Sequence, residues 1–239
     1  MMSDEFFERL PERIAKYDLL EHPFYKAWSA GELTNDDLHE YAKDYYHHVQ
    51  AFPSYLAELA VRLDDCELRR ALLANLADEK GLPAGGEERA TQRSTPHSEL
   101  WLDFVEGTGR TRAIKSHVPD PAIKQLTDFF HSIATDGTPD EALTAFYVYE
   151  SQVPAIATEK ARGLRDRYGK DEKTYGYFTL HATADIFHAN VWRNQLRARI
   201  NSGEANAEKA LSAGENSAKA LWQALDGIEA RRTQSLSAA

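Results

Sequence analysis

Apolar residues recur at intervals of three and four along almost the whole chain, and no segment shows the strict polar/apolar alternation of a half-buried strand. In the segment that begins at Thr34, one helical face carries Leu38, Tyr41, Tyr45, His48 and Phe52. Apolar side chains three and four residues apart lie on one face of an α-helix, so a helix can bury them together. The sequence therefore predicts an all-α protein, a bundle of seven or more helices.

Two local patterns mark helix N-termini. Asp37 follows Thr34 after three residues, and Thr138 is followed by Pro139 and Glu141, as in capping boxes. The second of these helices is predicted to end near residue 168, and further helices are predicted at about 67–80, 98–107, 120–134 and 173–200. The Gly- and Pro-rich segment 81–96 predicts a loop. We expect one domain over residues 1–200, followed over 201–239 by a C-terminal helix with a frayed end.

Charge and cysteine content exclude several classes of protein. The 239 residues carry a formal net charge of −10, which disfavours binding to nucleic acid or to an anionic membrane surface. No apolar run approaches the roughly 20 residues of a membrane span. The single cysteine, Cys66, excludes an intrachain disulfide, and we expect a cytoplasmic protein without a signal peptide.

The segment HATADIFH (181–188) places two histidines and a carboxylate on one helical face. At about 100° per residue, His181, Asp185 and His188 fall within about 60° of one another. Phe178 and Trp192 continue the same face, so it is expected to point inward. Buried polar groups need partners. A metal ion would satisfy all three, and hydrogen bonds within a polar part of the core are the alternative.

Two glutamates also occupy positions of predicted core faces. Glu79 extends the stripe that contains Leu76, whereas its neighbour Asp78 is expected to point elsewhere. Glu150 extends the stripe that contains Phe146. Each glutamate alone could be paired with arginine or hydrogen-bonded. Glutamates from two helices with histidines from a third are similar to the ligand set of a carboxylate-bridged dinuclear metal site in a helical bundle.

Several stretches resemble a known family. They are LEHPFY (20–25), WSAGELT (28–34), YAKDYY (41–46), AFP (51–53), YESQVP (149–154), EK (159–160) and HATADIFH (181–188). The chain resembles the heme-oxygenase-like dinuclear metal oxidases, whose fold is similar to that of thiaminase II and pyrroloquinoline-quinone synthase C. Within them it is most similar to the 4-aminobenzoate synthases related to the Chlamydia protein associating with death domains.

The resemblance implies two metal ions per chain, iron with iron or iron with manganese, and dioxygen and an external reductant as co-substrates. The implied ligands are Glu79, His97, Glu150, His181, Asp185 and His188. His97 is assigned because HSELWLDF (97–104) keeps the surroundings of the family's ligand after a loop longer by about ten residues, which is thermodynamically tolerable. Glu87 or Glu88 could substitute for it. The family also implies a homodimer.

The resemblance further implies three functional residues and a reaction. Tyr25 corresponds to a tyrosine consumed as the source of the product's ring, Lys160 to an amino donor, and Tyr149 to a tyrosine near the metals. We therefore expect a single-turnover oxygenase that makes 4-aminobenzoate for folate synthesis. Without the family, Tyr25 would be an ordinary packed aromatic residue and Lys160 a solvated lysine. The alternatives are a multiple-turnover oxidase of an external small molecule, a thiaminase II-like enzyme that uses Cys66, and a non-enzymatic interaction protein.

Overall fold

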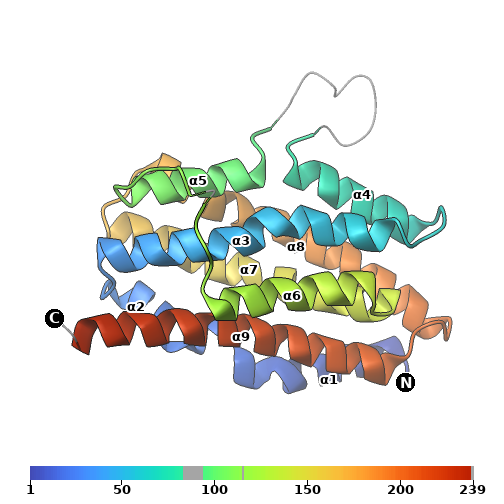
Figure 1. Ribbon diagram of the computed structural model, residues 1–239. Coiled ribbons are helices and arrows are strands. Elements are labelled where there is room, and N and C mark those ends of the chain that lie inside the picture. The colour runs from blue at the N-terminus through green and yellow to red at the C-terminus, as the bar shows by residue number, and fades with distance from the viewer. Residues whose placement is uncertain (83–93, 115, 238–239) are drawn as a thin grey trace.

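The computed structural model describes residues 1–82, 94–114 and 116–237. All regular elements in these residues are helical, which confirms the predicted all-α class (Figure 1). The α-helices are α1 (Ser3–Ile14), α2 (Pro23–Ala30), α3 (Asn35–Ala60), α4 (Glu67–Glu79), α5 (His97–Gly107), α6 (Pro121–Thr135), α7 (Pro139–Asp166), α8 (Glu172–Asn201) and α9 (Ala207–Ser237). The 3₁₀ turns η1 (Ala15–Tyr17) and η2 (Leu19–Glu21) connect α1 to α2.

The predicted helix starts are present with their caps. Thr34 and Thr138 each accept a hydrogen bond from the backbone three residues on, in the capping boxes of α3 and α7. Sequence analysis did not predict α1 and α2, and α2, with 8 residues, is little more than two turns long. The last two residues of the predicted C-terminal helix, 238–239, and most of the predicted loop, with Glu87 and Glu88, lie outside the described residues.

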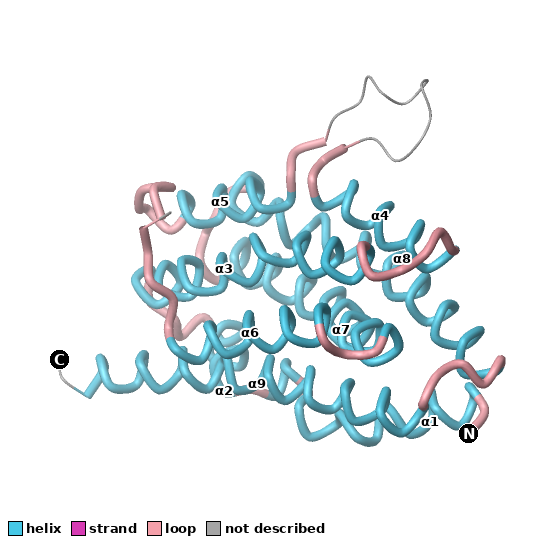
Figure 2. The backbone as a smooth tube through the Cα atoms, turned by 45° about the vertical axis from the view of Figure 1, so that its right-hand side comes forward, coloured by secondary structure: helices cyan, strands magenta, loops and turns pink. Residues whose placement is uncertain are grey.

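The long helices α7 and α8 pack along each other at the centre of the bundle. Helix α9 covers α6 and α7, and α3 packs against α4, α5 and α6. Two views show α4 and α5 on one side of the bundle and α1, α2 and α9 on the other (Figures 1 and 2). The end of α4 and the start of α5 therefore enclose the side of α8 that faces them.

Helix α7 carries a close contact that depends on a missing side chain. Gly163 faces Trp28, and a Cβ atom at this position would lie 2.8 Å from the indole ring. The indole Nε1 donates a hydrogen bond to the backbone oxygen of Lys160 at 3.3 Å. Glycine at position 163 thus lets α2 approach the turn of α7 that carries Lys160.

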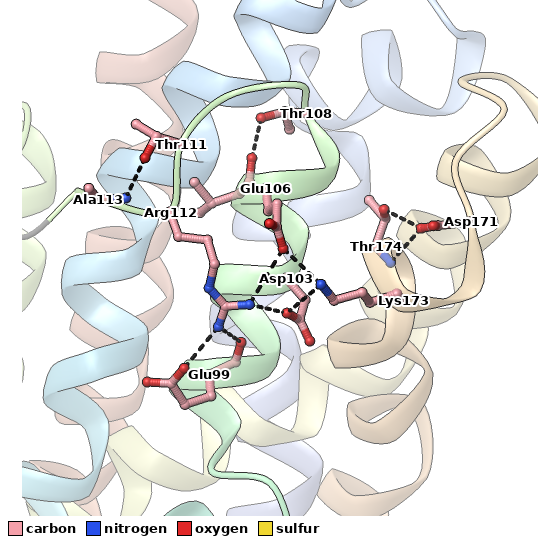
Figure 3. A network of polar contacts seen from close by, with 11 residues as sticks. Glu99, Asp103, Glu106, Thr108, Thr111, Arg112, Ala113, Asp171, Lys173 and Thr174 are labelled. Carbon is pink, nitrogen blue, oxygen red and sulfur yellow. Dashed lines mark hydrogen bonds and ion pairs between the residues drawn. The ribbon is translucent and has the colours of Figure 1, made fainter.

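A network of ion pairs joins the C-terminal part of α5 to the start of α8 (Figure 3). Lys173 Nζ lies 2.8 Å from Glu106 and 3.5 Å from Asp103, and Arg112 pairs with Asp103 and Glu99. Exposed pairs contribute about 1 kcal/mol or less each. Here these pairs hold α5, which begins at residue 97, against α8, which contains residues 181–188.

Among the described residues, no helix combines the length and the apolar character that crossing a membrane requires.

Candidate metal centre

The structure brings the six predicted ligands together in two buried groups. The first triad consists of Glu79, His97 and His181, and the second triad of Glu150, Asp185 and His188; within each, the ligand atoms lie within 4.8 Å of one another. All six residues are at most 6% exposed. The ligands come from α4, α5, α7 and α8. Four helices therefore hold one cluster of metal-binding groups, as in dinuclear bundle proteins.

The first triad forms where α4 ends and α5 begins. Glu79 is the last residue of α4 and His97 the first of α5. His97 Nδ1 lies 3.0 Å from Glu79 Oε1, but it is buried without a hydrogen-bond partner. A buried polar atom without a partner is costly. Its position beside a carboxylate suits two ligands that converge on one cation.

The third member of the first triad is fixed by α8 itself. His181 Nδ1 donates a hydrogen bond to the backbone oxygen of Tyr177 at 2.7 Å, and the two rings stack with centroids 3.9 Å apart. This hydrogen bond places the ring proton on Nδ1 and leaves Nε2 free to bind a metal. Burial lowers the pKa of His181, which favours the neutral imidazole that a metal requires.

The second triad is held by hydrogen bonds to its carboxylates. Glu150 accepts hydrogen bonds from Asn75 Nδ2 at 3.0 Å and from the indole of Trp192. His188 Nδ1 lies 3.3 Å from Asp185 Oδ1 and 3.9 Å from Glu150 Oε1. Burial, followed by the charge of Asp185, raises the pKa of Glu150 to about 8. Two buried carboxylates this close favour a positive charge between them.

The residues present fit two divalent ions. Both triads contribute to the lining of one cavity of about 10 Å³, through Glu79 and His181 from the first and Glu150 and Asp185 from the second. The first triad offers two imidazoles and one carboxylate, and the second offers one imidazole and two carboxylates. Imidazole and carboxylate are ligands that suit iron and manganese. Three carboxylates would offset three of the four positive charges of two such ions.

A second cavity, of about 30 Å³, contains the other predicted functional residues. Tyr25, Tyr149 and Lys160 line it. Lys160 is 5% exposed, so it is not the solvated lysine that the sequence alone indicates. Its Nζ donates a hydrogen bond to the Tyr25 hydroxyl at 2.8 Å and another to the Tyr41 hydroxyl, and the two hydroxyls lie 3.2 Å apart. Burial lowers the pKa of Lys160 well below its ordinary value, which favours a neutral amine.

Two tyrosines separate the two cavities. Tyr149, which precedes the predicted ligand Glu150, and Tyr177, which stacks on the predicted ligand His181, line both of them. Aromatic side chains with hydroxyl groups therefore form the wall between the predicted ligands and the pair of Tyr25 and Lys160.

Sequence reasoning missed several residues around the site. Asp78 lies off the buried stripe that contains Glu79, as expected, and it is half-exposed. Its Oδ2 nevertheless lies 3.3 Å from His188 Nε2, a contact across to α8 that sequence reasoning did not predict. Asn75, Tyr41 and Tyr177 were also missed. Asn75 lies one helical turn before Glu79, and that spacing could have identified it.

Comparisons with known proteins identify the family of this chain. Residues 39–222 match the profile of a family described as iron-containing redox enzymes. The chain is 38% identical to a 4-aminobenzoate synthase of Chlamydia trachomatis over 226 residues, which cover 93% of this chain and 91% of that protein. It is 37% identical to a 4-aminobenzoate synthase of Chlamydia muridarum over 230 residues, covering 95% and 91%.

A solved structure shows the same fold. A Shewanella denitrificans domain of unknown function with a heme oxygenase-like fold superposes with a TM-score of 0.80 at 17% identity, covering 100% of this chain and 97% of that one. The heme-oxygenase-like bundle and the family resemblance inferred from the sequence are both confirmed. The roles of the individual site residues stay predictions.

Proposed function

This chain belongs to the family of iron-containing redox enzymes and is an oxidoreductase, and on that premise we propose that it makes 4-aminobenzoate from its own Tyr25. Lys160 would supply the amino group. The observation that carries the proposal is the 2.8 Å contact between Lys160 Nζ and the Tyr25 hydroxyl, in a cavity that shares two wall residues with the metal-binding groups.

The environment of Lys160 supports a role as nitrogen donor. A protonated ammonium has no lone pair, and burial favours the neutral form. Nζ lies 4.2 Å from the centre of the Tyr25 ring and 4.4 Å from that of Tyr41. The amine is thus held beside the ring carbon that carries the oxygen to be exchanged for nitrogen. Such positioning replaces a bimolecular encounter.

The contacts of Lys160 favour an internal ring over an external one. The Tyr25 ring is itself part of the wall of this cavity. The Lys160 amine already donates hydrogen bonds to the hydroxyls of Tyr25 and Tyr41. These contacts support the use of Tyr25 itself, with a multiple-turnover reaction on an external small molecule as the alternative.

The triads would hold two metal ions, iron with iron or iron with manganese, which with dioxygen and an external reductant would supply the oxidising power. The chain's own residues would orient and enclose the reaction. Tyr149 and Tyr177 would keep bulk water from the ligands, and Lys160 would hold Tyr25 through its hydroxyl. The product requires loss of part of the tyrosine side chain, so each chain would react once.

Cys66 does not support the thiaminase-like alternative. Its side chain caps the first turn of α4 and accepts a hydrogen bond from the backbone nitrogen of Arg69 at 3.5 Å. Glu79 lies at the other end of the same helix, about 20 Å away at 1.5 Å per residue.

The metal part of the proposal is tested by metal content. Protein grown with iron and manganese should contain two ions per chain. Glu150→Ala and His188→Ala should each lower the content sharply while the circular dichroism stays helical, because the substitutions remove ligands and leave the packing of the bundle intact. Two full equivalents in both variants would refute the assignment. If His97→Ala alone keeps two equivalents, Glu87 or Glu88 replaces it as the candidate ligand.

The source of the ring is tested by isotope labelling. Protein made with ring-labelled tyrosine is reduced and exposed to air with unlabelled small molecules. We expect labelled 4-aminobenzoate in no more than one equivalent per chain, and an altered Tyr25 in peptide mass spectra. Tyr25→Phe should keep the metals and lose the product. Tyr147→Phe is the matched control, since this tyrosine packs against Phe7 and does not line the cavity.

The role of Lys160 has its own variant. Lys160→Arg keeps a long nitrogen-bearing side chain, but its guanidinium stays protonated and is a poor nitrogen donor. We expect normal metal content and no 4-aminobenzoate. A yield equal to that of the wild type would exclude Lys160 as donor. Unlabelled product in many equivalents per chain would favour an oxidase with an external substrate.

A further inference from the structure

Asp78 connects the protein surface to a predicted metal ligand. Its Oδ2 lies 3.3 Å from Nε2 of His188. The side chain of Asp78 is 44% exposed and that of His188 is 5% exposed. Asp78 belongs to neither triad, so the triads alone assign it no role.

The two nitrogens of His188 face different partners. Nδ1 faces the carboxylates of its own triad, 3.3 Å from Asp185 and 3.9 Å from Glu150. Nε2 faces outward to Asp78. A histidine that binds a metal through Nδ1 carries its proton on Nε2, and the acceptor of that proton fixes the ring. The geometry assigns this place to Asp78.

We propose that Asp78 is a positioning residue that accepts the Nε2 proton of His188 and so sets the tautomer, orientation and basicity of this ligand. This inference rests on the proposed two-metal centre. It concerns the second triad alone, since the corresponding proton of His181 goes to a backbone oxygen of Tyr177. A carboxylate acceptor makes the imidazole a stronger donor to the metal than a neutral carbonyl does.

The last turn of α4 would then act on both metal positions. Glu79 points into the first triad, and the preceding residue, Asp78, reaches the second through His188. Consecutive residues of a helix point about 100° apart, so Asp78 and Glu79 can contact two different groups at the end of α4. The end of α4 would thus support one ligand directly and one through a hydrogen bond.

The experiment compares metal release from loaded protein. Wild type, Asp78→Asn, Asp78→Ala and Asp78→Glu are loaded with cobalt(II) and titrated with a chelator of known affinity. The Asn and Ala variants should hold one of the two ions about 10–100-fold more weakly, the usual effect of losing such a partner. The other ion should keep its wild-type affinity, and Asp78→Glu should restore most of the loss. The visible bands of the weakened cobalt ion should shift.

The matched control is Asp65→Asn, which removes the same charge from an exposed carboxylate just before α4 that pairs with Arg70. It should leave both affinities unchanged. Equal affinities in wild type and Asp78→Asn, or a parallel loss at both positions, would overturn the inference. A wild-type protein that binds fewer than two ions would instead refute the two-metal centre, so the two failures are distinguishable.

Discussion

The buried amine of Lys160 makes a quantitative prediction about stability. Replacing it by methionine keeps a long unbranched side chain in the cavity and removes the titrating group. Wild type and Lys160→Met should therefore differ in how their stability depends on pH. The hydrogen bonds to Tyr25 and Tyr41 are lost as well, but that loss does not vary with pH below the ionisation of tyrosine.

The sign follows from the direction of the pKa shift. Burial lowers the pKa of Lys160 in the folded chain, whereas in the unfolded chain it is near 10.4. Between these two values the unfolded chain binds one more proton than the folded chain. The free energy of unfolding of wild type, relative to the methionine variant, should then rise with pH by about 1.4 kcal/mol per unit. From pH 8 to 9.5 the change is about 2 kcal/mol.

Urea unfolding followed by circular dichroism measures this difference, with both proteins in the same metal state. The range stops at pH 9.5, because tyrosines ionise near pH 10 in the unfolded chain. Lys124→Met is the control, since Lys124 is exposed on α6 and pairs with Asp128. Its difference from wild type should show no such slope. A difference between wild type and Lys160→Met that is constant over this range would refute the idea that the fold holds a neutral amine.

Three further predictions concern the scaffold. Gly163→Ala should lower the free energy of unfolding by about 1–3 kcal/mol, because its Cβ would press on Trp28. Tm should fall by about 2–4 °C for each kcal/mol, and an unchanged Tm in calorimetry would contradict this. Thr138→Ala should cost about 0.5–2 kcal/mol in urea unfolding by removing the cap of α7, and Thr138→Ser should restore it. Trp192→Phe should weaken metal binding by removing a hydrogen bond to Glu150, as chelator competition would show; unaltered affinity would mean that Asn75 alone positions the carboxylate.

The predicted ligands on α8 could be placed on one buried face from the sequence because one element contains them. His181, Asp185 and His188 share a face by helical geometry alone, and the structure buries that face. The pairing of Glu79 with His97 is different. It depends on how α4 and α5 return past each other, and no local pattern carries this information. Only the family resemblance led to His97.

Tertiary contacts explain what the sequence analysis missed. Lys160 lies on the helical stripe of Ile156, Ala157 and Leu164, which are buried with it. A lysine on its own is typical of a solvated position, and the hydroxyls that bind its amine come from α2 and α3. The reach of Asp78 depends on the distance between α4 and α8, which helical phase does not give. Local periodicity predicts the face on which a residue lies. It does not predict a partner on another helix.

Glu150 and Lys160 lie on one helix, α7, with Pro154 between them. Proline cannot donate a hydrogen bond to the backbone oxygen of Glu150, four residues earlier, so this turn lacks one helical hydrogen bond. Ten residues at 1.5 Å each still separate the two residues by about 15 Å along the helix. Deleting one residue between them would shorten this separation by about 1.5 Å and turn Lys160 by about 100° relative to Glu150. The number of residues on this part of α7 therefore couples the predicted metal ligands to the cavity that holds the amine.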